Sequence, residues 1–218
     1  MARSLPRFTV PTLTVEQGAE VATVLQERLF ALQDLAATLK HVHWNVVGPD
    51  FIAVHQMIDP QVDAVRAMID ATAERIATLG VSPVGTPGAL VEARTWRDYP
   101  LGRATTTDHL RTLDGVYVGF VVAHRAAAAH VGEIDDVSHD LLVTHLLELE
   151  LFHWFVRAHL ETADGALPGL SGETPVAVPT SPVPTSTVPT AAPAPSTRKT
   201  GASKAPSSRK AAARPREP

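Results

Sequence analysis

The architecture of the chain is clearest in residues 39–79, which read LKHVHWNVVGPDFIAVHQMIDPQVDAVRAMIDATAERIATL. Gly48-Pro49-Asp50 breaks this segment, and Asp50 can cap a helix that runs to Leu79, where Gly80 and then Pro83 end it. Pro60 lies inside this helix and predicts a kink, because proline removes a backbone hydrogen bond. The segment therefore indicates two long helices joined by a short turn.

The segment before this turn predicts a long amphipathic helix over residues 15–41, with Thr14 as its cap. Its apolar residues recur at helical spacing and are Val21, Val24, Leu25, Leu29, Leu32, Leu35, Ala36 and Leu39. Residues 81–102 are rich in proline and glycine and predict a crossover with only a short helix near Arg94–Trp96.

Two more helices are predicted after the crossover, at about residues 103–131 and 138–163. The last is entered at Asp135-Asp136-Val137-Ser138 and closed by Asp164-Gly165. Four long helices with one long crossover between the second and the third form the ferritin-like four-helix bundle. The predicted fold class is therefore all-α, with a short helix in the crossover.

Composition limits the possible functions. The 218 residues contain no cysteine, which excludes disulfides and thiolate chemistry, so any metal must be bound by histidines and carboxylates. No stretch is long and apolar enough for a membrane span, and the start of the chain lacks the apolar run of a signal peptide. We therefore expect a cytoplasmic protein.

From residue 166 the helical pattern gives way to Pro, Thr, Ser and Ala, which predicts a disordered tail. We divide the chain into an N-terminal arm (1–14), a helical domain (15–165) and this tail (166–218). The tail ends in seven cations against one acid, Glu217, and favours sequence-independent DNA binding, or folding back onto the acidic body. The cations are Arg198, Lys199, Lys204, Arg209, Lys210, Arg214 and Arg216.

The second helix carries two pairs of possible metal ligands on one face. They are His55 with Asp59, and Asp70 with Glu74, each spaced i and i+4. The pairs lie about 16 Å apart along the axis, too far for one ion. Two copies packed antiparallel would bring the first pair of one copy opposite the second pair of the other. We therefore hypothesise a metal site between subunits. Such charges can also be a solvated helix face.

The strings LKHVHWNVVGP (39–49), FIAVHQMID (51–59) and AER (73–75) closely resemble the Dps family, the DNA-binding proteins from starved cells, in its actinobacterial form. The similarity covers roughly residues 15–163. It implies a homo-oligomeric, dodecameric hollow shell with ferroxidase sites at dimer interfaces. By position, the iron ligands and catalytic residues implied are His43, His55 and Asp59 of one subunit with Asp70 and Glu74 of its neighbour.

The resemblance also implies a function. Members oxidise Fe(II), usually with hydrogen peroxide, store the ferric product and protect DNA from oxidative damage. Trp44 matches an aromatic residue beside the site that is thought to intercept radicals, although it can equally be a packing aromatic. Gln56 departs from the Glu of many relatives, at a position that is not a ligand.

Two further patterns have alternative interpretations. Asp135, Asp136 and Asp140 match the family's acidic iron-entry pore, but Asp135 and Asp136 can instead cap the last helix. Glu150 and His153 form a lone Glu-x-x-His, a spacing that ordinary ferritins use twice. We expect a structural role for this pair.

Two other functions compete with ferroxidase activity. One is a nucleoid-associated, DNA-compacting protein that acts through its basic tail. The other is a dimetal helical-bundle enzyme with all ligands inside one bundle, which the single Glu-x-x-His argues against.

Overall fold

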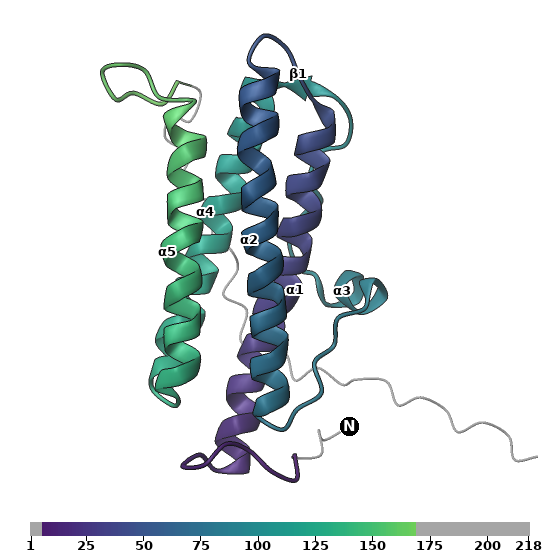
Figure 1. The fold of residues 1–218 in the computed structure, drawn as a ribbon, viewed down its shortest axis with the longest axis vertical. Helices are drawn as coiled ribbons and strands as arrows, with labels where there is room; N and C mark the ends of the chain where they lie inside the picture. The colour runs from purple at the N-terminus through teal and green to yellow at the C-terminus, as the bar shows by residue number, and fades with distance from the viewer. Residues whose placement is uncertain (1–5, 169–218) are drawn as a thin grey trace, which may run out of the picture. The chain divides into compact units, whose positions relative to one another are not determined.

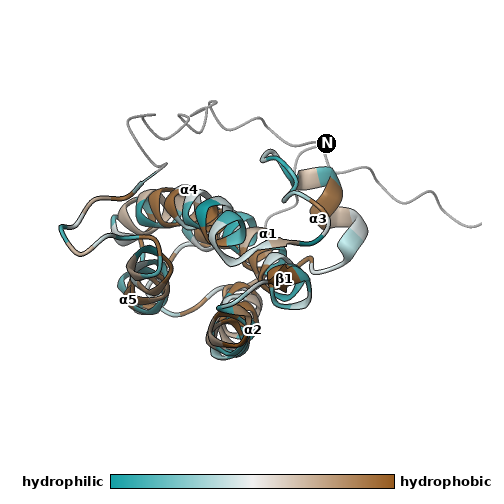
Figure 2. Cartoon of the chain, turned by 90° about the horizontal axis from the view of Figure 1, so that it is seen from above, coloured by the Kyte–Doolittle hydropathy of each residue, from teal (hydrophilic) through white to brown (hydrophobic). Residues whose placement is uncertain are grey.

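The computed structural model describes residues 6–168. It contains five helices and two short strands, in the order α1 (Val15–Asn45), β1 (Val46–Val47), α2 (Phe51–Thr78), α3 (Pro87–Ala93), β2 (Ala104–Thr105), α4 (Thr106–Gly132) and α5 (Asp136–Ala158). The four long helices lie side by side as a bundle, with α3 outside it in the crossover (Figures 1 and 2). The all-α, ferritin-like prediction is confirmed.

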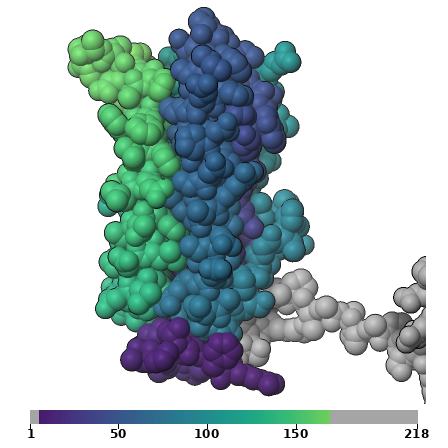
Figure 3. Space-filling view, in the orientation of Figure 1, coloured from purple at the N-terminus to yellow at the C-terminus, as the bar shows by residue number. Residues whose placement is uncertain are grey.

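The bundle is made of two helical hairpins, α1–α2 and α4–α5. Along one face α2 and α5 run next to each other, and the purple N-terminal segment covers one end of the bundle (Figure 3). Gly80 follows α2 with a φ of 86°, and a Cβ there would lie 2.0 Å from the Phe8 carbonyl oxygen. Glycine is therefore required where the N-terminal segment crosses the end of α2.

Apolar side chains from all four long helices form two separate buried clusters. One cluster includes Leu32, Leu39 and Ile58 toward the α1–α2 turn. The other includes Leu25, Ile76 and Leu142 toward the α4–α5 turn. A layer of buried polar side chains divides them, with Thr72 on α2, His124 on α4 and His145 on α5.

The crossover is tied to α1 by side-chain hydrogen bonds. The Gln26 amide donates to the Val84 carbonyl and accepts from the Val84 N–H, both at 2.8 Å. Farther along, Asp34 accepts from Arg94 at 3.1 Å and from the Trp96 indole at 2.7 Å. Beyond these ties, β2 pairs in parallel with β1, with Val46 opposite Ala104.

The ends of α1 and α2 agree only partly with the sequence-based expectations. Thr14 and Gln17 form a complete capping box at the start of α1, as the Thr14 prediction required. Asp50 occupies the N-cap position of α2, but its side chain makes no capping hydrogen bond. Helix α2 continues without a break across Pro60.

Two predicted elements lie elsewhere. The short crossover helix is Pro87–Ala93 and not Arg94–Trp96, because Pro87 suits the first turn of a helix and Arg94 already has an extended backbone. Helix α5 ends at Ala158 and not near residue 163. Beyond Ala158, the His159 ring nitrogen Nδ1 donates to the Phe155 carbonyl at 2.7 Å, and the Leu160 N–H donates to the Arg157 carbonyl at 2.8 Å, a bond that spans three residues in place of four.

Within residues 6–168 no helix combines the length and apolar character needed to cross a membrane. The tail that we predict to be disordered, including its seven basic residues, lies outside the described residues, except for 166–168.

Candidate metal centre

Three of the predicted ligands meet where α1 ends and α2 begins. The rings of His43 on α1 and His55 on α2 stack with centroids 3.6 Å apart and an interplanar angle of 24°. His43 Nδ1 lies 3.2 Å from Asp59 Oδ1, one turn farther along α2. The tight turn that contains Gly48 positions these groups, because it folds α2 back along α1 (Figure 1).

The two imidazoles hold each other in place through the backbone. His43 Nδ1 donates to the His55 carbonyl, and His55 Nδ1 donates to the His43 carbonyl, each at 3.0 Å. A carbonyl oxygen only accepts hydrogen bonds, so the proton of each neutral ring is on Nδ1. Each Nε2 therefore keeps a lone pair, which is the state that binds a metal ion.

Lys40 also belongs to this cluster, and sequence reasoning missed it. Its ammonium group donates to Asp59 Oδ1 at 2.9 Å and lies 5.8 Å from the centroid of the Trp44 ring. The hydrogen bond from Lys40 is the main reason why the pKa of the Asp59 carboxyl is below its ordinary value. The signal in the sequence was the position of Lys40, one helical turn before His43. Trp44 is exposed and does not pack in the core.

Asp70 and Glu74 lie on exposed parts of α2, away from this cluster along the helix. Although His43, His55 and Asp59 are neighbours, no three His, Asp or Glu side chains among residues 6–168 are arranged so that they could hold one metal ion. The contacts of His43, His55 and Asp59 are therefore those of a partial site. Completion by Asp70 and Glu74 of a second copy stays a prediction.

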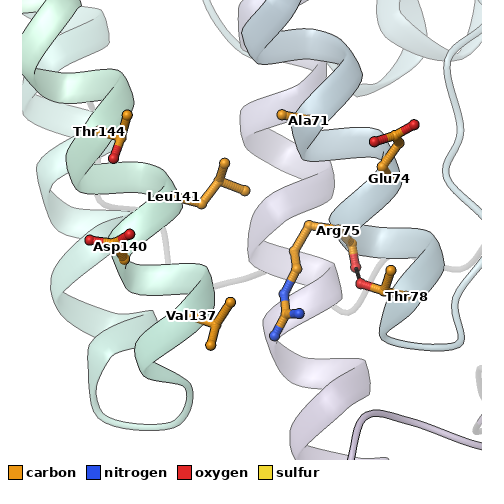
Figure 4. A pocket seen from close by; sticks show the side chains of 8 residues that line it. All are labelled: Ala71, Glu74, Arg75, Thr78, Val137, Asp140, Leu141 and Thr144. Atoms are coloured by element: carbon orange, nitrogen blue, oxygen red, sulfur yellow. Dashed lines mark hydrogen bonds between the residues drawn. The ribbon is translucent and has the colours of Figure 1, made fainter.

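A shallow groove of about 430 Å³ runs between α2 and α5, with Glu74 on one side and Asp140 on the other (Figure 4). Deeper in, Arg75 donates to Asp135 Oδ2 at 2.7 Å and to the Ser138 hydroxyl at 2.8 Å. Burial would raise the pKa of Asp135, but the hydrogen bonds from Ser138 and Arg75 outweigh it and lower that pKa. This groove is lined by one proposed ligand, Glu74, and by one of the predicted pore residues, Asp140.

The three pore candidates differ in their surroundings. Asp135 is buried and caps α5 by accepting from the Ser138 N–H at 3.1 Å. Asp136 and Asp140 are exposed. The capping alternative therefore describes Asp135, while a pore role for Asp136 and Asp140 stays a prediction.

The two residues of the lone Glu-x-x-His make separate contacts with α4. Glu150 pairs with Arg125, and His153 Nε2 lies 2.7 Å from Asp114 Oδ1, which also accepts from Arg157 at 2.9 Å. Both residues thus link α4 to α5, the structural role expected for them.

A family model described as ferritin-like domain matches residues 22–166. A Mycolicibacterium smegmatis protein named DNA protection during starvation protein is 55% identical over 160 residues, which cover 73% of this chain and 87% of that protein. A Haemophilus ducreyi protein named fine tangled pili major subunit is also 55% identical, over 72% of this chain and 83% of its own length.

A solved structure is similar to this chain in both fold and sequence. The structure of DpsA14 from Streptomyces coelicolor superposes with a TM-score of 0.74 at 58% identity, over 76% of this chain and 99% of that one.

Proposed function

This chain belongs to the Dps family of ferritin-like proteins, and on that premise we propose that it is a ferroxidase that stores iron. It oxidises Fe(II), preferably with hydrogen peroxide, at sites shared between subunits, and it holds the ferric product in a dodecameric shell. The observation that supports this most directly is the cluster of His43, His55 and Asp59, in which both imidazoles keep Nε2 free.

The second half of each site comes from a neighbouring subunit. Asp70 and Glu74 are exposed on the same helix as His55 and Asp59, so two antiparallel copies of α2 bring the two groups together. Ala64 and Ala67 lie near the midpoint of this helix and permit close approach of the two backbones.

Iron is the substrate of this reaction. One peroxide molecule takes one electron from each of two Fe(II) ions, and with two protons it yields two water molecules and two Fe(III) ions. Carboxylates are hard ligands that favour Fe(III) over Fe(II), and histidine nitrogens complete a mixed set with open positions. Asp59, Asp70 and Glu74 therefore favour oxidation, while His43 and His55 orient the ion.

The direct test is peroxide-driven oxidation after anaerobic loading with Fe(II), followed by ferric absorbance. We expect fast oxidation at about one peroxide per two Fe(II) in the wild type, and a rate close to that of buffer in Asp59→Ala. Asp63→Ala is the matched control, since Asp63 is an exposed carboxylate four residues along α2. Equal rates in the two variants, with both correctly assembled, would contradict the proposal.

Sharing of the site between subunits has its own test. Asp59→Ala and Glu74→Ala chains are unfolded, mixed and reassembled. If each site takes ligands from two chains, the mixture regains some intact sites and activity, whereas each variant alone stays inactive. A mixture no more active than its components would exclude shared sites.

A second function, protection by direct DNA binding, is favoured by the names of the relatives and by the basic end of the chain. Its seven cations would neutralise phosphates, and twelve copies on one shell would act together. We expect deletion of residues 196–218 to abolish plasmid retardation in gels and leave iron oxidation unchanged. Retardation that survives the deletion would exclude the tail as the binding element. Binding of this kind would make the protein cytoplasmic and nucleoid-associated.

A further inference from the structure

The polar layer in the core lies along the apolar stripes of three helices at one level. On α1, Arg28 lies next to the buried Leu29, which continues the apolar stripe of that helix. On α4, His124 takes a position of the stripe itself, where the spacing calls for an apolar residue. On α5, His145 lies next to the buried Leu146, which continues the stripe.

The polar atoms of this layer lack partners. His124 is fully buried and neither of its ring nitrogens makes a hydrogen bond. His145 is 4% exposed and its Nδ1 is unpartnered, as is the shielded Nε of Arg28. The two rings lie 5.7 Å apart between centroids. Unpaired buried donors and charges are costly, so a further group is expected here.

The charge of the layer determines which kind of group fits. Burial is the main cause that lowers the pKa of His124, to about 3, and the positive charges of Arg28 and His145 lower it further. No carboxylate among the described residues is among the causes that act on His124, whereas the exposed Glu27, which precedes Arg28 on α1, favours the charged form of Arg28. The remaining long helix, α2, contributes Thr72, whose hydroxyl donates to the carbonyl of Met68 on the same helix. The site is thus positive and rich in donors, which disfavours a metal cation and favours an anion.

We propose that Arg28, His124 and His145 bind one small monovalent inorganic anion, of the size of chloride, inside the bundle between α1, α4 and α5. The Arg28 guanidinium supplies the charge, and an N–H of each imidazole donates to the anion. The site is small because apolar clusters close it on both sides. Nothing in the proposed iron chemistry uses these residues.

Anion binding is coupled to protons in this site. A bound negative charge favours the charged imidazolium, so the anion raises the low pKa values of both histidines. Binding therefore becomes tighter as the pH falls, until the bundle itself unfolds.

The proposal is tested with the assembled full-length protein at constant ionic strength, with bromide replacing gluconate. We expect a saturable rise in melting temperature, larger at pH 5 than at pH 7 because pH 5 is closer to the pKa values of about 3 for His124 and about 4 for His145, and an anomalous-scattering peak for bromide beside Arg28 and His124. Arg28→Met should weaken the apparent affinity at least about tenfold, since a charge-assisted hydrogen bond is lost. His124→Phe is the second variant, in case Arg28→Met fails to fold.

Arg66→Met is the matched control, because Arg66 is an exposed arginine whose only ion pair in the described residues is with Asp63. It should keep the full bromide response. A response of equal size in Arg28→Met, His124→Phe and Arg66→Met would reveal general salt effects only and overturn the proposal. So would a wild type with no saturable response or no bromide peak. Iron oxidation is measured in parallel on the same variants. Because the proposed iron chemistry uses none of these residues, its outcome does not depend on whether bromide binds.

Discussion

Lys40 places an ammonium group on the carboxylate that is proposed to bind iron. Its 2.9 Å contact with Asp59 Oδ1 means that a metal ion must displace Lys40 before it uses this oxygen. At the scale of single residues, the Lys40 ammonium group and a metal ion therefore compete for the same oxygen of Asp59. Side-chain exposures of 22% for Lys40 and 51% for Asp59 keep this ion pair weak.

Replacing Lys40 by Met should strengthen binding of Fe(II). We expect a dissociation constant about two- to fivefold lower in anaerobic calorimetry, because a weak, exposed ion pair that competes with the metal is removed. Lys40→Arg keeps the charge and should bind as the wild type does. Weaker binding in Lys40→Met would show that Lys40 supports the site and does not compete with the metal.

At the scale of elements, the start of α5 depends on Asp135. This side chain caps the helix and pairs with Arg75 of α2, and both groups are largely shielded from water. The contact joins the helix that carries the proposed ligands to the helix that carries the predicted pore residues.

Asp135→Ala should lower the free energy of unfolding by about 2 to 4 kcal/mol, from loss of the cap and from the unpaired Arg75. Asp136→Ala, one residue along and exposed, should change it by less than about 1 kcal/mol. Chemical denaturation of both variants measures the difference. Similar values would mean that Asp135 is not a structural residue of this helix end.

The sequence predicted the long helices well because their signals are local. Thr14 caps α1 as predicted, and the apolar spacing in α1 is regular. The predicted end of α5 was wrong because the backbone tightens after Ala158, where the Leu160 N–H donates to the carbonyl of Arg157, three residues back. Strands β1 and β2 were missed because two residues carry no periodic signal, and Lys40 was missed because its partner Asp59 is 19 positions away.

The candidate site was predictable only in part for a similar reason. The resemblance supplied His43, and the fold brings it to His55 and Asp59. Spacing alone placed Asp70 and Glu74 on the same helix as His55 and Asp59, but the partners proposed for them belong to another chain. Of Arg28, His124 and His145, only His124 interrupts an apolar stripe in the sequence. That the three residues lie at one level is seen only in the packed helices.

At the scale of the whole molecule, the buried histidines make stability depend on pH. Burial lowers the pKa of His145 to about 4 and, with Arg28 and His145, that of His124 to about 3. Both values are below the ordinary value of about 6.5 that applies in the unfolded chain. Below this value the unfolded state binds more protons than the folded state, so stability falls as the pH falls.

We expect each of these histidines to remove up to about 2 kcal/mol of stability between pH 6.5 and pH 5. A His124→Phe/His145→Leu variant should therefore show a flatter dependence of unfolding free energy on pH in denaturation series. Phe152→Leu is the control, since it alters the core without an ionisable group and should lower stability equally at each pH. Parallel curves for the wild type and the double variant would contradict the linkage.

The short pairing of β1 with β2 has a consequence for how the chain folds. Helices α1 and α2 are neighbours in sequence, and so are α4 and α5, so each hairpin closes only a short loop. Val46 and Ala104 are 58 positions apart, so their pairing must wait until both hairpins exist. In pulse-labelling hydrogen exchange, amides inside the hairpins should gain protection before the β1–β2 amides do, and simultaneous protection would contradict this order. The folding rate is then set by docking of two preformed hairpins, with the β1–β2 pairing as the step that joins them.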